Sequence, residues 1–174
     1  IFISTPFSFA AVDRLARMKV PAIKIGSGEC NNYPLVKYIT KLKKPIILST
    51  GMNSIKTIEP SVKIIRKARI PYALLHCTNL YPTPNKLVLL NTITNLRKKF
   101  TDAVIGLSDH SENIYTCLGA ISLGARIIEK HFTDSKKRKG PDISSSMDQK
   151  ELRELIKGTR AVYEARGIKK NPGK

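Results

Sequence analysis

The sequence has few acidic residues, few aromatic residues and no tryptophan. It has 13 Asp and Glu residues and 31 Lys and Arg residues, so the 174-residue chain has a formal net charge of +18. Such a charge is typical of nucleic-acid binders, but aromatics make up only 6% and no zinc-finger spacing or aromatic-basic repeat is present. The basic groups, such as residues 97–99 and 136–139, fall where helices or loops are expected, as on a solvated surface. We therefore expect no nucleic-acid partner. A non-catalytic basic module that binds nucleic acid or acidic polysaccharide is the alternative from another class.

Cysteines and long apolar runs are also scarce. The three cysteines, Cys30, Cys77 and Cys117, are odd in number and far apart, which excludes a disulfide framework and a zinc cluster. No apolar run approaches the roughly 18 residues of a membrane helix. No basic start leads into an apolar signal segment. We therefore expect a cytoplasmic protein without a membrane partner.

The sequence instead contains short apolar strands that alternate with amphipathic helices. This alternation is the pattern of repeated βα units, and nearly continuous apolar strands are typical of a parallel sheet covered on both faces. The expected strands are residues 1–4, 22–25, 45–48, 72–76, 104–107 and 126–129. The expected helices are residues 10–18, 35–42, 54–68, 92–100, 113–123 and 148–165, the last beginning with a capping box of Asp148 and Glu151.

Polar residues follow every expected strand. In a (β/α)8 barrel, the carboxyl ends of the strands build one active site, whereas a doubly wound sheet often carries a glycine-rich first turn that is missing here. We therefore predict an α/β fold, an incomplete TIM (β/α)8 barrel with about six βα units, strands 3 to 8. Because the chain begins inside an expected strand, we expect about two units to precede Ile1.

Two histidines, His110 and His131, follow neighbouring expected strands. Two imidazoles can hold a divalent ion and leave coordination positions open, although either histidine could instead be an ordinary hydrogen-bonded residue. Glu29 could add a ligand. His76 lies in an apolar strand, and we expect it to be a hydrogen-bonded core residue.

Lys24, Ser27, Ser49 and Ser108 supply one cation and three hydroxyls near neighbouring strand ends. This combination suits a compact anion such as phosphate or carboxylate. Serine is also common at strand ends as a turn or capping residue, so each hydroxyl alone has a simpler structural explanation. Their joint placement favours an anion site.

Seven strings, in order along nearly the whole chain, resemble the N-acetylneuraminate (sialic acid) synthase family. They are Ser-Thr-Pro-Phe (4–7), Lys-Ile-Gly-Ser-Gly-Glu (24–29), Ile-Leu-Ser-Thr-Gly-Met (47–52), His-Cys-Thr-Asn-Leu-Tyr-Pro-Thr-Pro (76–84), Gly-Leu-Ser-Asp-His (106–110), Glu-Lys-His-Phe-Thr (129–133) and Gly-Pro-Asp (140–142). The resemblance implies condensation of phosphoenolpyruvate with N-acetylmannosamine to give N-acetylneuraminate and phosphate, dependent on Mn²⁺ or Mg²⁺.

The resemblance also assigns roles by motif. It implies that His110 and His131 bind the metal, with Glu29 close to it, and that Lys24, Tyr81 and Glu29 are catalytic. Glu129 and Asp142 would contact the amino sugar. The residues implied to bind phosphoenolpyruvate are Thr5, Lys24, Ser27, Ser49, Asn79, Tyr81 and Ser108.

Sister synthases that make legionaminic or pseudaminic acid are the nearest alternative, and the segment 28–35 favours N-acetylneuraminate. The resemblance places a partial catalytic barrel at residues 1–165 and the start of a linker to an absent antifreeze-like domain at residues 166–174. It also implies a homodimer for the full-length protein. Because two βα units and that domain are missing, we expect the 174-residue chain alone to be inactive.

Overall fold

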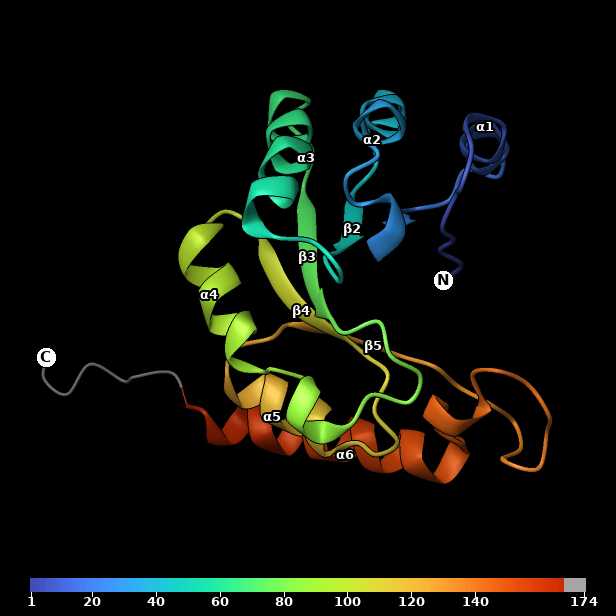
Figure 1. Cartoon of the computed structure of the whole chain (residues 1–174), viewed down its shortest axis with the longest axis vertical. Helices are drawn as coiled ribbons and strands as arrows, with labels where there is room; N and C mark the ends of the chain where they lie inside the picture. Colours follow the sequence, from blue (N-terminus) through green and yellow to red (C-terminus); the bar gives the residue numbers. More distant parts are fainter. Residues whose placement is uncertain (168–174) are drawn as a thin grey trace, which may run out of the picture.

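The computed structural model describes residues 1–167, in which a curved sheet of five parallel strands is the central element (Figure 1). The strands lie side by side in chain order, and each pairs in parallel with the next. A helix follows each strand, as parallel pairing requires a crossover connection. The strands are β1 (Ile23–Ile25), β2 (Ile46–Ser49), β3 (Tyr72–Cys77), β4 (Val104–Asp109) and β5 (Ile127–Lys130).

The helices lie on the outer side of the curved sheet (Figure 1). No helix in residues 1–167 is long and apolar enough to cross a membrane. The α-helices are α1 (Phe9–Arg17), α2 (Tyr33–Ile39), α3 (Ile55–Lys67), α4 (Asn91–Lys99), α5 (Tyr115–Ser122) and α6 (Gln149–Ala165). Short 3-10 helices occur at η1 (Ser27–Glu29), η2 (Thr40–Leu42), η3 (Asn85–Leu87) and η4 (Ile143–Ser145).

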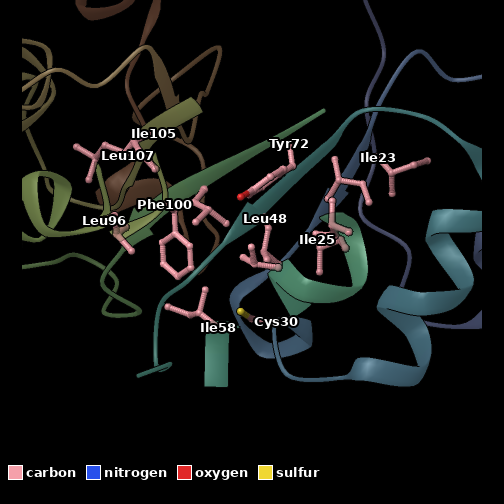
Figure 2. Close-up of a cluster of buried hydrophobic side chains, with 14 of the residues drawn as sticks. Ile23, Ile25, Cys30, Leu48, Ile58, Tyr72, Leu96, Phe100, Ile105 and Leu107 are labelled. Carbon is pink, nitrogen blue, oxygen red and sulfur yellow. The ribbon is translucent and has the colours of Figure 1, made fainter. Parts of the chain in front are cut away.

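The hydrophobic core lies between the sheet and these helices. Alternate strand residues, such as Ile23, Leu48 and Ile105, are buried against helix residues that include Leu96 (Figure 2). Burying each of these large side chains contributes about 1.5–3 kcal/mol. Since side chains alternate across a strand, the residues between them point to the opposite, inner face of the sheet.

The sheet curls enough for its first and last strands to meet through side chains on this inner face. Lys24 Nζ on β1 lies 3.4 Å from Glu129 Oε1 on β5. Neighbouring strands are about 4.8 Å apart, so these two strands would be roughly 19 Å apart in a flat sheet. The structure is therefore a curled half-barrel, which agrees with the expected partial TIM barrel.

Most expected elements are confirmed, with small shifts at their ends. The capping box of α6 is present, because Asp148 Oδ1 accepts from the Glu151 N–H and Glu151 Oε2 accepts from the Asp148 N–H, both at 2.9 Å. Helix α2 ends three residues before the expected boundary, where η2 continues the chain. Residues 168–174 of the expected linker lie outside the described residues.

The strand expected at residues 1–4 is wrong. Only Ser4 pairs with the sheet, through an isolated bridge to Ile23 in which the Lys24 N–H donates to the Ser4 carbonyl. Ile1, the first apolar residue, is fully exposed. β-Branched residues favour a strand only when they pack on neighbours, and no neighbouring strand covers the outer edge of this segment in the part of the chain described here. The described sheet therefore has five strands instead of six.

Candidate functional site

A polar network connects β1, β2, β4 and β5 on the inner face of the sheet. Lys24 Nζ donates to Ser49 Oγ at 2.8 Å and lies 3.4 Å from Glu129 Oε1. Ser108 Oγ donates to the same carboxylate oxygen at 2.7 Å. The register explains these contacts, because Ser108 pairs directly with Glu129. Only 12% of the Lys24 side chain is exposed, so its ammonium is held by this network at the carboxyl ends of the strands.

A cavity of about 280 Å³ opens beside this network. Larger hollows occur elsewhere, one of about 570 Å³ at the amino-terminal ends of β4 and β5. We assign the site to the smaller cavity, because active sites of β/α barrels lie at the carboxyl ends of the strands. The cavity is lined by Thr5, Lys24, Ser108, Asp109, His110, Glu129, Lys130 and His131.

Three rings cluster at this cavity, where Tyr81 lies against the two lining histidines. The Tyr81 ring centroid lies 4.0 Å from that of His110 and 5.7 Å from that of His131. The two imidazole centroids are 5.3 Å apart. Both histidines therefore line the same cavity, and their role as metal ligands stays a prediction.

His110 is held in a form that suits a metal ligand. Its Nδ1 lies 2.8 Å from the Thr78 carbonyl, which can only accept, so Nδ1 carries the proton and Nε2 keeps a free lone pair. Burial lowers the pKa of His110 below its usual value, and the neighbouring His131 lowers it further. Both effects favour the neutral imidazole that coordinates metals.

The spacing of the two imidazole rings matches that of two ligands of one divalent ion. Two imidazoles whose nitrogens are each about 2.1 Å from one metal have ring centroids roughly 5 Å apart, taking the Zn–N distance as a guide. The observed separation of 5.3 Å is close to that value. No group of three or more His, Cys, Asp or Glu side chains that could hold a metal is present among residues 1–167.

The loops after β1, β2 and β3 meet at Gly51. Ser27 Oγ accepts a hydrogen bond of 3.0 Å from the Gly51 N–H. A Cβ at this glycine would lie only 1.9 Å from Asn79 Oδ1 and 2.9 Å from Ser27 Oγ. Absence of a side chain at Gly51 therefore lets two of the residues predicted to bind phosphoenolpyruvate approach each other.

The residues predicted to bind the sugar lie beside the histidines. Asp142 Oδ2 is 3.7 Å from His131 Nδ1, and Glu129 lines the cavity. Glu29 is not brought into this group. It belongs to η1, where its carboxylate accepts a 2.6 Å hydrogen bond from Asn32, and its metal and catalytic roles stay predictions.

His76 is confirmed as a core residue. It is buried on the helix side of β3, and its Nε2 lies 2.6 Å from the Val88 carbonyl. Its position shows why a histidine near a strand end is by itself a weak sign of a site. His110 differs because it lines the cavity and lies against a second histidine.

Sequence reasoning missed a buried ion pair beside the site. Asp109 Oδ2 and Lys130 Nζ are 2.6 Å apart, and both side chains are 1% exposed. These residues immediately precede His110 and His131 in the Ser-Asp-His and Glu-Lys-His strings. The signal was their opposite charge at the ends of neighbouring strands.

Comparison with known proteins identifies the family of this chain. The NeuB family model matches residues 1–171. The N,N'-diacetyllegionaminic acid synthase of Campylobacter jejuni is 42% identical over 95% of this chain and 50% of its own length. The N-acetylneuraminate-9-phosphate synthase of Drosophila melanogaster is 40% identical over 88% of this chain and 43% of its own length. The chain spans about half the length of the curated relatives it matches.

A solved structure has the same fold. The crystal structure of N-acetylneuraminic acid (sialic acid) synthetase from Leptospira borgpetersenii aligns with a TM-score of 0.93 and 34% identity. The alignment covers 98% of this chain and 59% of that one. The family model, the relatives and the fold agree, and the chain belongs to the NeuB family.

Proposed function

We propose that this chain carries the central part of the active site of a synthase that condenses phosphoenolpyruvate with N-acetylmannosamine. The products are N-acetylneuraminate and phosphate. The observation that carries the proposal is that one cavity is lined by the mostly buried Lys24, by the polar strand residues Ser108 and Glu129, and by two histidines. Membership of a family whose relatives are named as synthases of nonulosonic acids supports it.

Phosphoenolpyruvate would bind through Lys24 and the surrounding hydroxyls. The Lys24 ammonium is a point charge suited to a phosphate or carboxylate, and Ser49 and Ser108 can donate to anionic oxygens. In the structure these donors are satisfied by one another and by Glu129. An entering anion would replace those contacts. Thr5, Ser27, Asn79 and Tyr81 would complete the subsite.

The amino sugar would bind at the mouth of the cavity, beside the rings. Carboxylates accept hydrogen bonds from sugar hydroxyls; Asp142 lies beside His131, and Glu129 lines the same cavity as His131. Burial raises the pKa of Tyr81, so its phenol stays protonated and can donate a hydrogen bond between the two substrates. This arrangement would orient the sugar aldehyde toward C3 of phosphoenolpyruvate, as bond formation requires.

His110 and His131 would hold Mn²⁺ or Mg²⁺. When bound, such an ion supplies Lewis acidity that polarises the sugar carbonyl. The carbon-carbon bond forms between C3 of phosphoenolpyruvate and the aldehyde carbon. Water then adds at C2, and phosphate leaves by cleavage of its C–O bond. Lys24 would hold the phosphate group during these steps.

The choice of sugar among the sister reactions is a separate proposal. Relatives of this chain include synthases named for N,N'-diacetyllegionaminic acid, N-acetylneuraminate 9-phosphate and pseudaminic acid. The segment 28–35 is the feature that favours N-acetylmannosamine as the acceptor. The chemistry at Lys24 and the two histidines would be the same for each sugar.

A binding experiment on the chain tests the proposed site directly. We expect Mn²⁺ to increase the relaxation rate of the ³¹P signal of phosphoenolpyruvate, because the metal and the anion would bind in one cavity. His110→Ala should abolish the enhancement by weakening metal binding, and Lys24→Met should abolish it by weakening anion binding. Lys56→Ala, at an exposed position on α3, is the matched control and should leave the enhancement intact. Equal enhancement in all four proteins would overturn the proposal.

A further inference from the structure

The buried ion pair of Asp109 and Lys130 joins the two strand positions that immediately precede the histidines. Their partner atoms are 2.6 Å apart, and the two residues face each other in the register of β4 and β5. Each residue is covalently followed by one of the histidines that line the cavity. A displacement of either charged residue along its strand would therefore move the adjacent imidazole.

The pair is also tied to the segment that follows β4 and to α5. Asp109 Oδ2 accepts from Ser111 Oγ at 2.7 Å, and Asp109 Oδ1 accepts from Thr116 Oγ1 at 2.9 Å. Lys130 Nζ donates to the Ser111 carbonyl as well. Both carboxylate oxygens and the ammonium are thus engaged by partners from three parts of the chain.

A buried ion pair needs an explanation beyond stability. Removing two charges from water costs about as much free energy as their attraction returns, and apolar residues of similar volume stabilise a core as well or better. A charged pair instead favours one register of the two strands over the others, because any shifted register leaves a buried charge without its partner. A slip of either strand by one residue would also move the histidine of that strand to the opposite face of the sheet.

We propose that the Asp109–Lys130 ion pair is a positioning element that fixes the spacing of His110 and His131 for a divalent ion. The inference rests on the proposed function, because it assumes that the two histidines bind metal. The other polar contacts of the rings do not link the two strands. His110 is held by the Thr78 carbonyl, and His131 lies 3.7 Å from Asp142.

The test compares metal binding in variants that keep the core filled. Asp109→Leu combined with Lys130→Met removes both charges and leaves neither unpaired. We expect this double variant to unfold at a temperature close to that of the unaltered chain, and its affinity for Mn²⁺ to fall about 10- to 100-fold. The electron paramagnetic resonance signal of free Mn²⁺ measures the affinity. Pulsed measurements detect the coupling of bound Mn²⁺ to the ¹⁴N nuclei of the imidazoles, and this coupling should be weaker in the double variant. Ser61→Ala removes a buried hydroxyl from α3, away from the cavity, and is the control.

The outcomes separate this inference from the proposed function. If the unaltered chain does not bind Mn²⁺, or binds it without ¹⁴N coupling from imidazole, both the proposed function and the positioning role would be overturned. Binding in the unaltered chain with equal affinity and equal ¹⁴N coupling in the folded double variant would overturn the positioning role alone. If the double variant does not fold, Asp109→Asn combined with Lys130→Met takes its place, because it removes both charges and keeps an oxygen that can accept from Thr116 Oγ1. That variant should bind Mn²⁺ several-fold more weakly, and unchanged affinity would contradict the inference.

Discussion

At the scale of single residues, the site depends on side chains whose surroundings restrict their chemical state. Lys24 is mostly buried among Ser49 and Glu129. His110 is held in one tautomer by the Thr78 carbonyl. Such constraints prepare groups for binding, because less rearrangement is needed when a ligand arrives.

Lys24→Met should lower the affinity for phosphoenolpyruvate about 10- to 100-fold. A hydrogen bond to a charged group contributes about 1.5–3 kcal/mol, and methionine keeps most of the aliphatic volume without the charge. Isothermal titration with phosphoenolpyruvate measures the effect, with Lys56→Ala as the control for a lost surface charge. Equal affinities in the unaltered chain and the Lys24 variant would contradict an anion site at this lysine.

The three cysteines should react slowly with Ellman's reagent in the folded chain. Burial raises the pKa of Cys30 and Cys117 to about 12 and also raises that of Cys77. At pH 8, a thiol with such a pKa is ionised on the order of one part in ten thousand, and the thiolate is the reactive form. In 6 M guanidinium chloride all three should react quickly. Fast reaction of three thiols in native buffer would show that the core is open.

At the scale of elements, register places the site, and small residues allow the strands to pack closely. A Cβ at Gly106 would lie 2.4 Å from the Ile127 carbonyl oxygen and 2.5 Å from Leu75 Cδ2. This glycine therefore permits β4 to lie tightly between β3 and β5. The same pairing aligns Ser108 with Glu129 in the polar network.

Gly106→Ala should lower the free energy of unfolding by about 1–3 kcal/mol, because the added methyl group must displace backbone or core atoms. Gly28→Ala is the matched control, since a Cβ at that position meets nothing within 4 Å. Urea denaturation of the two variants measures the difference. A Gly106 variant as stable as the control would show that the strands can separate without cost.

At the scale of the whole molecule, the sequence predicts most of the architecture. Apolar periodicity locates the helices and five strands, and the Asp148–Glu151 capping box marks the start of α6. The strand at residues 1–4 fails because strand formation depends on a neighbour that local sequence does not reveal. The Glu29 carboxylate accepts a hydrogen bond from Asn32, three residues later, and the spacing of motifs does not reveal such a local contact. The pairing of Asp109 with Lys130 could not be predicted from the sequence, because it depends on the register of β4 and β5.

From the net charge of +18 we predict how the melting temperature of the chain depends on salt. Excess positive charge destabilises a compact state through self-repulsion, and added salt screens it as the Debye length falls to about 10 Å at 0.1 M. The melting temperature should therefore rise between 10 mM and 200 mM NaCl. A decrease would indicate that exposed ion pairs, such as Arg138–Asp134, stabilise the chain by more than the repulsion destabilises it.

The most direct measurement of the central proposal is release of phosphate from phosphoenolpyruvate in the presence of N-acetylmannosamine and Mn²⁺. The enzyme to test is this chain completed with the remaining segments of the Campylobacter jejuni relative. We expect release that needs both substrates and the metal and is lost in His110→Ala. Release with a 2,4-diacetamido sugar instead would reassign the sugar among the sister reactions. A folded protein that releases no phosphate with any of these sugars would contradict the proposed synthase.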